Sequence, residues 1–95
     1  MNLLPEYLFL GNWTDQGRKT IEEVPKRVET IQNAVEEQNG SMSTYFTMGE
    51  YDFVALVDMP DEESMVKIIM KINSMKAAVT KTLKAWPASE FVKMF

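Results

Sequence analysis

The chain has 95 residues, of which 45% are hydrophobic and 25% charged, and its formal net charge is −4. This length and composition are typical of one globular domain over residues 1–95, and the acidic balance argues against nucleic acid as a partner. The sequence contains no cysteine and no histidine, which excludes disulfides, thiol catalysis and the commonest metal and acid–base sites.

The N-terminal segment MNLLPEYLFLGNW is apolar, but it has no basic residue at its start and is interrupted by Pro5 and Glu6. A signal peptide begins with a positive region, and a membrane span needs about 20 apolar residues. The segment fits neither, so we expect a cytoplasmic protein without membrane contact. Its second part, residues 6–13, is rich in large apolar side chains and predicts the first strand.

The residues after this strand predict a helical segment in two parts. Thr14 or Asp15 can cap a first turn. Apolar residues then follow at steps of three and four, which places them on one helix face: Ile21, Val24, Val28, Ile31 and Val35. Because Pro25 lacks the N–H of a helix interior, we expect a short helix to about residue 23 and a restart with Pro25 in its first turn.

Two strands are predicted next, over residues 41–48 and 51–59. The helix before them is expected to end at Asn39–Gly40, with Gly40 taking a positive φ at low cost. Gly49–Glu50 lies between the two strands and predicts a tight hairpin.

A second helix is predicted to start at Pro60, with acidic residues in its first turn, where the helix dipole favours them. Its apolar stripe consists of Met65, Ile68, Ile69, Ile72 and Met75. Residues 77–86 predict a fourth strand that Pro87 ends, and residues 89–95 predict a short amphipathic helix. The order β-α-β-β-α-β indicates an α+β, ferredoxin-like sandwich, in which two helices cover one face of a four-stranded antiparallel sheet.

The first and third strands form the central pair of this topology, and both of their faces are apolar. One face carries Tyr7, Phe9, Trp13, Phe53, Ala55 and Val57, and the other carries Leu8, Leu10, Val54 and Leu56. An antiparallel sheet with one face in water alternates apolar and polar residues instead. Since soluble monomers rarely expose so large an apolar patch, we expect a homodimer that packs sheet against sheet.

Four stretches of the chain resemble the GYD domain family. They are YLFLGNWTDQGRKTI (7–21), PKRVE (25–29), TMGEYDFVALVDMPDEES (47–64) and the weaker TKTLKAW (80–86). The resemblance implies a ferredoxin-like protomer and a dimer closed through its sheets, as in the dimeric α/β-barrel superfamily, and it leaves room for a higher oligomer. It implies no assigned activity.

Asp52 lies between Tyr51 and Phe53 in the third predicted strand. A buried carboxylate there costs several kcal/mol unless it is paired or hydrogen-bonded. It can be structural, accepting hydrogen bonds from a turn or from Lys26 or Arg27. It can also be functional, as a base or ligand anchor at the mouth of a pocket.

A candidate ligand site follows from the direction of the strands. The end of the first strand and the start of the third meet at one end of the sheet, because the two strands are antiparallel. We predict a small-molecule site there, with an amide, an indole, hydroxyls and a carboxylate around one cavity: Asn12, Trp13, Thr14, Tyr45, Thr47, Tyr51 and Asp52. Simple aromatic packing at this end is the alternative.

Two functions fit these features. The first is a homodimeric binding or regulatory module for a small aromatic or apolar molecule. The second is a cofactor-independent enzyme, resembling a monooxygenase or an isomerase, in which Asp52, Tyr51 or Tyr45 moves the proton. A purely structural role in assembly stays open.

We expect no cofactor and no metal site. The acidic residues Asp58, Asp61, Glu62 and Glu63 lack the spacing of a calcium loop, and the helix dipole accounts for three of them.

Overall fold

The computed structural model describes residues 6–95, and Met1–Pro5, part of the N-terminal segment discussed above, lie outside the described residues. Residues 6–95 form four strands, four α-helices, the last of which is short, and one 3₁₀ turn. In chain order these are β1 (Glu6–Trp13), α1 (Asp15–Lys19), the 3₁₀ turn η1 (Ile21–Glu23), α2 (Val24–Glu37), β2 (Ser41–Phe46), β3 (Phe53–Asp58), α3 (Glu62–Ser74), β4 (Ala78–Ala85) and α4 (Ala88–Val92). This order confirms the predicted α+β, ferredoxin-like arrangement.

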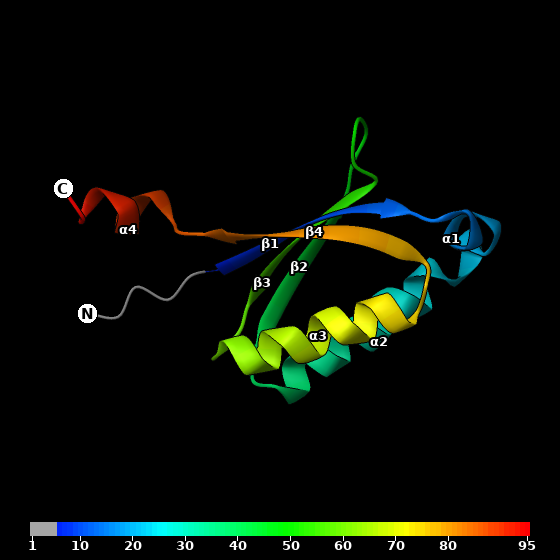
Figure 1. Ribbon diagram of the computed structural model, residues 1–95, viewed down its shortest axis with the longest axis horizontal. Helices are drawn as coiled ribbons and strands as arrows, with labels where there is room; N and C mark the ends of the chain where they lie inside the picture. The colour runs from blue at the N-terminus through cyan, green and yellow to red at the C-terminus, as the bar shows by residue number, and fades with distance from the viewer. Residues whose placement is uncertain (1–5) are drawn as a thin grey trace.

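The four strands form one antiparallel sheet in the order β2-β3-β1-β4. The central pair is β1 and β3, as predicted, with Tyr7 opposite Val57 and Leu10 opposite Val54. Helices α2 and α3 lie side by side on one face of this sheet (Figure 1). Each strand residue therefore points either toward these helices or away from them.

The core lies between the sheet and the two long helices. It contains Tyr7, Phe9, Ala55, Val57 and Met59 from the strands and their ends, Ile31 and Val35 from α2, and Met65 and Ile68 from α3. Ile69, Ile72 and Met75 pack against this cluster from α3 and the turn after it, so the predicted stripe of the second helix is confirmed. Ile21 is an exception in the first stripe, because it lies in η1 and is 47% exposed.

The helix starts follow from local capping chemistry. The Thr14 hydroxyl accepts a hydrogen bond from the Gly17 N–H at 3.0 Å and caps α1. Pro25 lies in the first turn of α2, where its missing N–H has no helical partner to lose. The Asp61 carboxylate accepts from the Ser64 N–H at 2.7 Å and caps α3.

Two local predictions are wrong. The residue with positive φ after α2 is Asn39 (φ 65°), not Gly40. Gly40 instead permits close approach, because a Cβ there would lie 2.6 Å from the Asp58 carbonyl oxygen.

The connection between β2 and β3 is also longer than the predicted two-residue hairpin. It spans residues 47–52 and is closed by the Thr47 N–H, which donates to the Asp52 carbonyl at 3.0 Å. Gly49 takes a positive φ of 123° within it. This loop extends away from the sheet (Figure 1), and Asp52 belongs to the loop and not to the strand.

The sheet face that α2 and α3 leave uncovered, called the open face below, is apolar. The strand register places seven large side chains on it: Leu8, Leu10, Tyr45, Val54, Leu56, Val79 and Leu83. Tyr45, Leu56, Val79 and Leu83 are between 41% and 65% exposed. The predicted apolar character of both faces of the central strands is thus confirmed.

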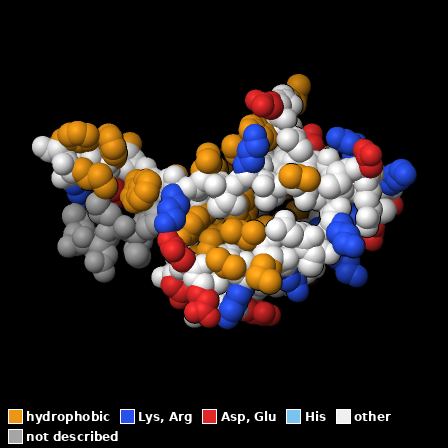
Figure 2. All heavy atoms as spheres, viewed as in Figure 1, with side chains coloured by type: hydrophobic (Ala, Val, Ile, Leu, Met, Phe, Trp, Pro, Cys, Tyr) orange, Lys and Arg blue, Asp and Glu red, His pale blue; other side chains and the backbone are white. Residues whose placement is uncertain are grey.

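The C-terminal helix α4 lies beyond the end of β4 and extends away from the sheet (Figure 1). The space-filling view shows hydrophobic side chains on this projection (Figure 2), where Phe91, Val92, Met94 and Phe95 are exposed. Among the helices of residues 6–95, none has the length and apolar character needed to cross a membrane.

Candidate functional site

An apolar cavity of about 70 Å³ lies between the sheet and the helices, at the end where β1 finishes and β3 begins. The sheet contributes Phe9, Trp13, Met42, Thr44, Phe46, Phe53, Ala55 and Ala78, and the helical side contributes Val24, Arg27, Val28, Ile31, Ile72, Met75 and Ala77. The first two turns of α2 and the end of α3 therefore form its roof. Hydrophobic side chains are visible between the sheet and the helices in Figure 2.

Three aromatic rings form the strand side of this cavity. The Trp13 ring lies 4.9 Å from the Phe53 ring and 6.3 Å from the Phe46 ring, measured between centroids. Gly11 makes this cluster possible, because a Cβ at that position would lie 2.1 Å from Cζ of Phe53. The Phe53 ring therefore occupies the space that a side chain at position 11 would fill.

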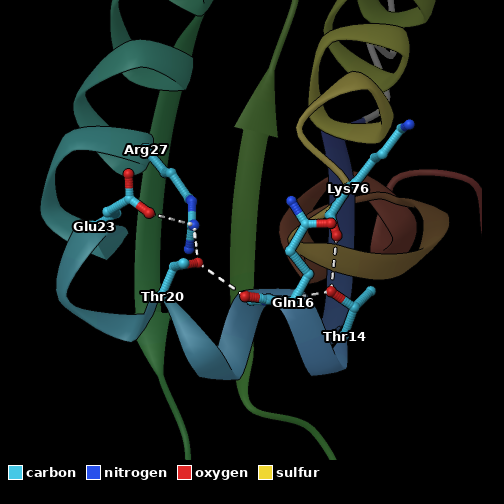
Figure 3. Close-up of polar contacts among 7 residues, drawn as sticks. Thr14, Gln16, Thr20, Glu23, Arg27 and Lys76 are labelled. Carbon is cyan, nitrogen blue, oxygen red and sulfur yellow. Dashed lines mark hydrogen bonds and ion pairs between the residues drawn. The ribbon is translucent and has the colours of Figure 1, made fainter.

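Arg27 is the one charged side chain among the described residues that line the cavity. Its side chain is only 18% exposed. One terminal nitrogen, Nη2, donates to the Thr20 hydroxyl and, at 3.3 Å, to the Glu23 carboxylate. Figure 3 shows Arg27 reaching from α2 toward Thr20 and Glu23.

The other terminal nitrogen of Arg27, Nη1, is buried and has no hydrogen-bond acceptor among the described residues. A buried donor without an acceptor costs about 1–3 kcal/mol, and more when the group is charged. Native proteins leave few such groups unpaired. Arg27, a residue of the cavity lining, therefore carries a buried nitrogen that calls for an acceptor.

The segment that closes this end of the sheet is held by backbone contacts to the turn before β4. The Thr14 hydroxyl donates to the Lys76 carbonyl at 2.7 Å (Figure 3). The Thr14 N–H donates to the Ala77 carbonyl at 3.0 Å. Gly17 is buried against the same turn, and a Cβ there would lie 2.0 Å from the Ala77 oxygen. These contacts fix α1 and, through Thr20, the surroundings of Arg27.

Asp52 has a structural partner in the backbone. Its Oδ2 accepts a hydrogen bond from the Trp13 N–H at 2.8 Å, and its own N–H donates to the Gly11 carbonyl at 2.8 Å. Of the structural partners considered for Asp52, a turn or Lys26 or Arg27, the structure shows a backbone N–H, and Arg27 donates to Thr20 and Glu23 instead. The hydrogen bonds of Asp52 thus extend the pairing of β1 with β3 by one residue beyond the Gly11–Phe53 pair.

The seven predicted site residues separate into four groups. Trp13 lines the cavity. Asp52, Thr47 and Tyr51 lie in one hydrogen-bonded loop, in which the Thr47 hydroxyl donates to the Tyr51 carbonyl at 2.6 Å. Thr14 binds the turn before β4, whereas Asn12 and Tyr45 lie on the open face.

The sequence reasoning missed Arg27 as a cavity residue, along with Phe46 and Phe53 as its aromatic walls. A signal for Arg27 was present in the sequence. It follows Val24 by three residues and precedes Ile31 by four, so it lies on the buried stripe of α2. A cation on an apolar helix face is unusual enough to mark a site.

The described residues hold no group of three or more acidic, histidine or cysteine side chains that could bind a metal ion. Three of the acidic residues considered above have other contacts. Asp61 caps α3, Glu62 accepts from the Lys84 ammonium group, and Glu63 forms an ion pair with Lys67 at 3.9 Å.

The model of the GYD domain family matches residues 7–95. Among curated proteins, the chain is similar to one described as "Glutamine synthetase and cystathionine beta-lyase binding protein" from Thermus thermophilus. The two are 26% identical over 91 residues, which cover 94% of this chain and 96% of the relative.

A solved structure shares the fold. It is the crystal structure of a protein from Thermus thermophilus, with a TM-score of 0.56 and 24% sequence identity. The alignment covers 88% of this chain and 95% of the other.

Proposed function

The chain belongs to the GYD domain family, and from that premise we propose that it is a homodimeric regulatory module that binds other proteins and a small molecule. The observation that carries this proposal is the open face, whose seven apolar side chains cover all four strands. An exposed apolar patch of this kind marks an interaction surface. The cavity beside Trp13 supplies a separate place for the small molecule.

The open face suits a second copy of the same chain. Its apolar centre is bordered by polar groups on the same face, Ser41, Ser43 and Lys81 among them, as in the core and rim of protein interfaces. Two such faces packed together would give the sheet-to-sheet dimer of an α/β barrel. A cytoplasmic setting stays a prediction from the sequence.

The dimer is tested by the solution mass of three variants. Leu56→Asp and Val79→Lys place a charge on the open face, and both are expected to shift the protein to the monomer mass in analytical ultracentrifugation. Val66→Asp is the matched control, because Val66 is 51% exposed on α3, away from the open face. A wild-type monomer at micromolar concentration, or variants that all remain dimeric, would contradict the proposal.

The protein partners are proposed by similarity. The relative from Thermus thermophilus is described as binding glutamine synthetase and cystathionine beta-lyase, and we propose that this chain likewise binds an enzyme. Biolayer interferometry with these two purified enzymes is the direct test. Saturable binding of either supports the proposal, and binding of neither at micromolar concentration removes this part of it.

The position of the candidate acid–base groups supports binding over catalysis. Tyr45 lies on the open face, and the Asp52 carboxylate is engaged with the Trp13 N–H. Of the seven predicted residues we propose Trp13 as the ligand contact. Thr14, Thr47, Tyr51 and Asp52 then hold the cavity end in place, while Asn12 and Tyr45 belong to the dimer surface.

A further inference from the structure

The cavity combines apolar walls with one buried cation that still has a free donor. Of the described residues that line it, Arg27 carries the charge, and its Nη1 has no acceptor. We propose that the cavity binds a small monocarboxylate with an aromatic or branched aliphatic body, anchored by Arg27. The inference deepens the proposed function, because it names the ligand class of the small-molecule site.

Arg27 is held ready for such a ligand. Its Nη2 is fixed by Thr20 and Glu23, so the guanidinium plane is already oriented and little side-chain freedom remains to be lost on binding. Glu23 is 56% exposed and contacts only that outer nitrogen. The buried nitrogen is left for a ligand oxygen, and a guanidinium binds carboxylates through charge-assisted hydrogen bonds.

The walls specify the rest of the ligand. The rings of Trp13, Phe46 and Phe53 stand on one side and the aliphatic residues of α2 and α3 on the other. The enclosed volume of about 70 Å³ is smaller than the roughly 150 Å³ of a cavity that encloses a benzene ring. Because the cavity is half open to solvent, a ligand with a single ring or a short branched chain fits only with part of its body in the opening. An apolar body packs favourably against such walls.

Other ligand classes fit less well. A phosphate would bring a second negative charge and several acceptors to a site with one charged group, and the apolar walls would leave most of these acceptors unpaired. A cationic ligand would be repelled by the positive charge of Arg27. A neutral molecule of the same shape would fill the walls but form a weaker bond to Nη1.

The test is a titration of the full chain with benzoate, followed by tryptophan emission. Trp86→Phe serves as the background, because it leaves Trp13 on the cavity wall as the single reporter. Benzoate is expected to change the Trp13 emission saturably. Arg27→Met keeps the apolar stem of the side chain and removes the charge, and it is expected to weaken benzoate binding at least tenfold.

Arg18→Met is the matched control. Arg18 is 61% exposed on α1 and pairs with Asp15, so its loss is expected to leave benzoate binding unchanged. Should Arg27→Met fail to fold, Arg27→Gln makes the same test, with the same tenfold loss expected. Benzoate affinity that is equal in wild type and in the folded Arg27 variant would overturn the proposal.

Three further probes resolve the ligand class. Benzyl alcohol is expected to bind more weakly than benzoate to the wild type, and to lose less affinity than benzoate does in Arg27→Met. Benzylamine and inorganic phosphate are expected not to bind. The proposal would be overturned if benzyl alcohol bound as tightly as benzoate, if phosphate bound more tightly than benzoate, or if benzoate gave no saturable response.

The solution mass, measured on the same samples, separates this inference from the proposed function. If the protein is a dimer that does not bind benzoate, only the proposed ligand class is wrong. A monomer that binds benzoate through Arg27 defeats the dimer and leaves the ligand site standing.

Discussion

The two ends of the interface between sheet and helices are built from the same elements but differ in packing. At one end, the packed end, Val35, Val57, Met65 and Ile68 are at most 2% exposed and fill the space between α2, α3 and the strands. At the other, the hollow end, the cavity residues around Trp13 and Arg27 leave about 70 Å³ unfilled. The same β1 and β3 run through both.

The difference separates stability from binding. Dense packing of apolar side chains supplies most of the favourable free energy of folding. A cavity with an unpaired guanidinium nitrogen lowers that free energy, and natural proteins tend to keep such features where they serve a function. The contrast between the ends can be tested by substitutions that have a counterpart at each end.

The largest effect is expected from two isoleucines one turn apart on α3. Ile68 is 2% exposed at the packed end, and Ile72 lines the cavity. Ile68→Ala is expected to lower the free energy of unfolding by about 2–5 kcal/mol, because it opens a void in dense packing. The Ile72 side chain already borders empty space, so Ile72→Ala is expected to lower the free energy of unfolding by only about 1–2 kcal/mol.

Urea denaturation at one fixed protein concentration measures both changes, since association would add to the stability. Equal losses for the two variants would show that the ends are packed alike.

A smaller effect is expected at Gly11, beneath the aromatic cluster of the hollow end. A Cβ in Gly11→Ala would overlap the Phe53 ring, at 2.1 Å from Cζ, so the ring must move toward Trp13 or into the cavity. We expect a loss of about 1–3 kcal/mol and weaker benzoate binding. The double variant Gly11→Ala with Phe53→Leu is expected to recover part of the stability, and no recovery would place the strain elsewhere.

The smallest effect is expected from the cap of α3, next to the packed end. The backbone N–H of Ser64 donates to the Asp61 carboxylate and, with the Ser64 side chain, holds the pKa of Asp61 below its ordinary value of 3.8. Because the folded-state pKa is the lower one, the charged cap stabilises the fold fully above pH 3.8. That contribution is lost as the pH falls below 3.8 through the folded-state pKa.

Asp61→Ala is therefore expected to be less stable than wild type at pH 7, with a difference that shrinks as the pH is lowered below 3.8. Thr14→Ala removes the corresponding cap of α1, whose hydroxyl does not titrate, and its difference from wild type is expected to lack this pH dependence. Urea midpoints measured between pH 7 and pH 3 distinguish the two caps.

Much of the fold could be predicted from the sequence. The apolar steps from Val24 to Val35 indicated α2, and Pro25 indicated its first turn, because both signals act within a few residues. The alternation in β1 and β3 indicated that both faces are apolar. The positive φ at Asn39 and the six-residue loop of residues 47–52 were missed, because asparagine and glycine both tolerate that conformation and loop length depends on the register of the strands.

The candidate site could be predicted only in part. The end of the sheet and Trp13 could be predicted from the direction of the strands. A structural role for Asp52 as a hydrogen-bond acceptor was one of the two alternatives that the sequence allowed. The partner of Asp52, the Trp13 N–H, comes from the pairing of β1 with the loop before β3. Arg27 was considered only as a partner for Asp52, although it bonds Thr20 and Glu23.

By itself the sequence determined which segments become helices and strands, in what order they follow, and which side chains share a face. These properties depend on periods of two and 3.6 residues and on caps, which a short segment carries alone. Only the tertiary structure decided that the helices pack densely at one end of the sheet and leave a cavity at the other. A void depends on the volumes and positions of side chains from several elements at once, and no local pattern encodes that sum.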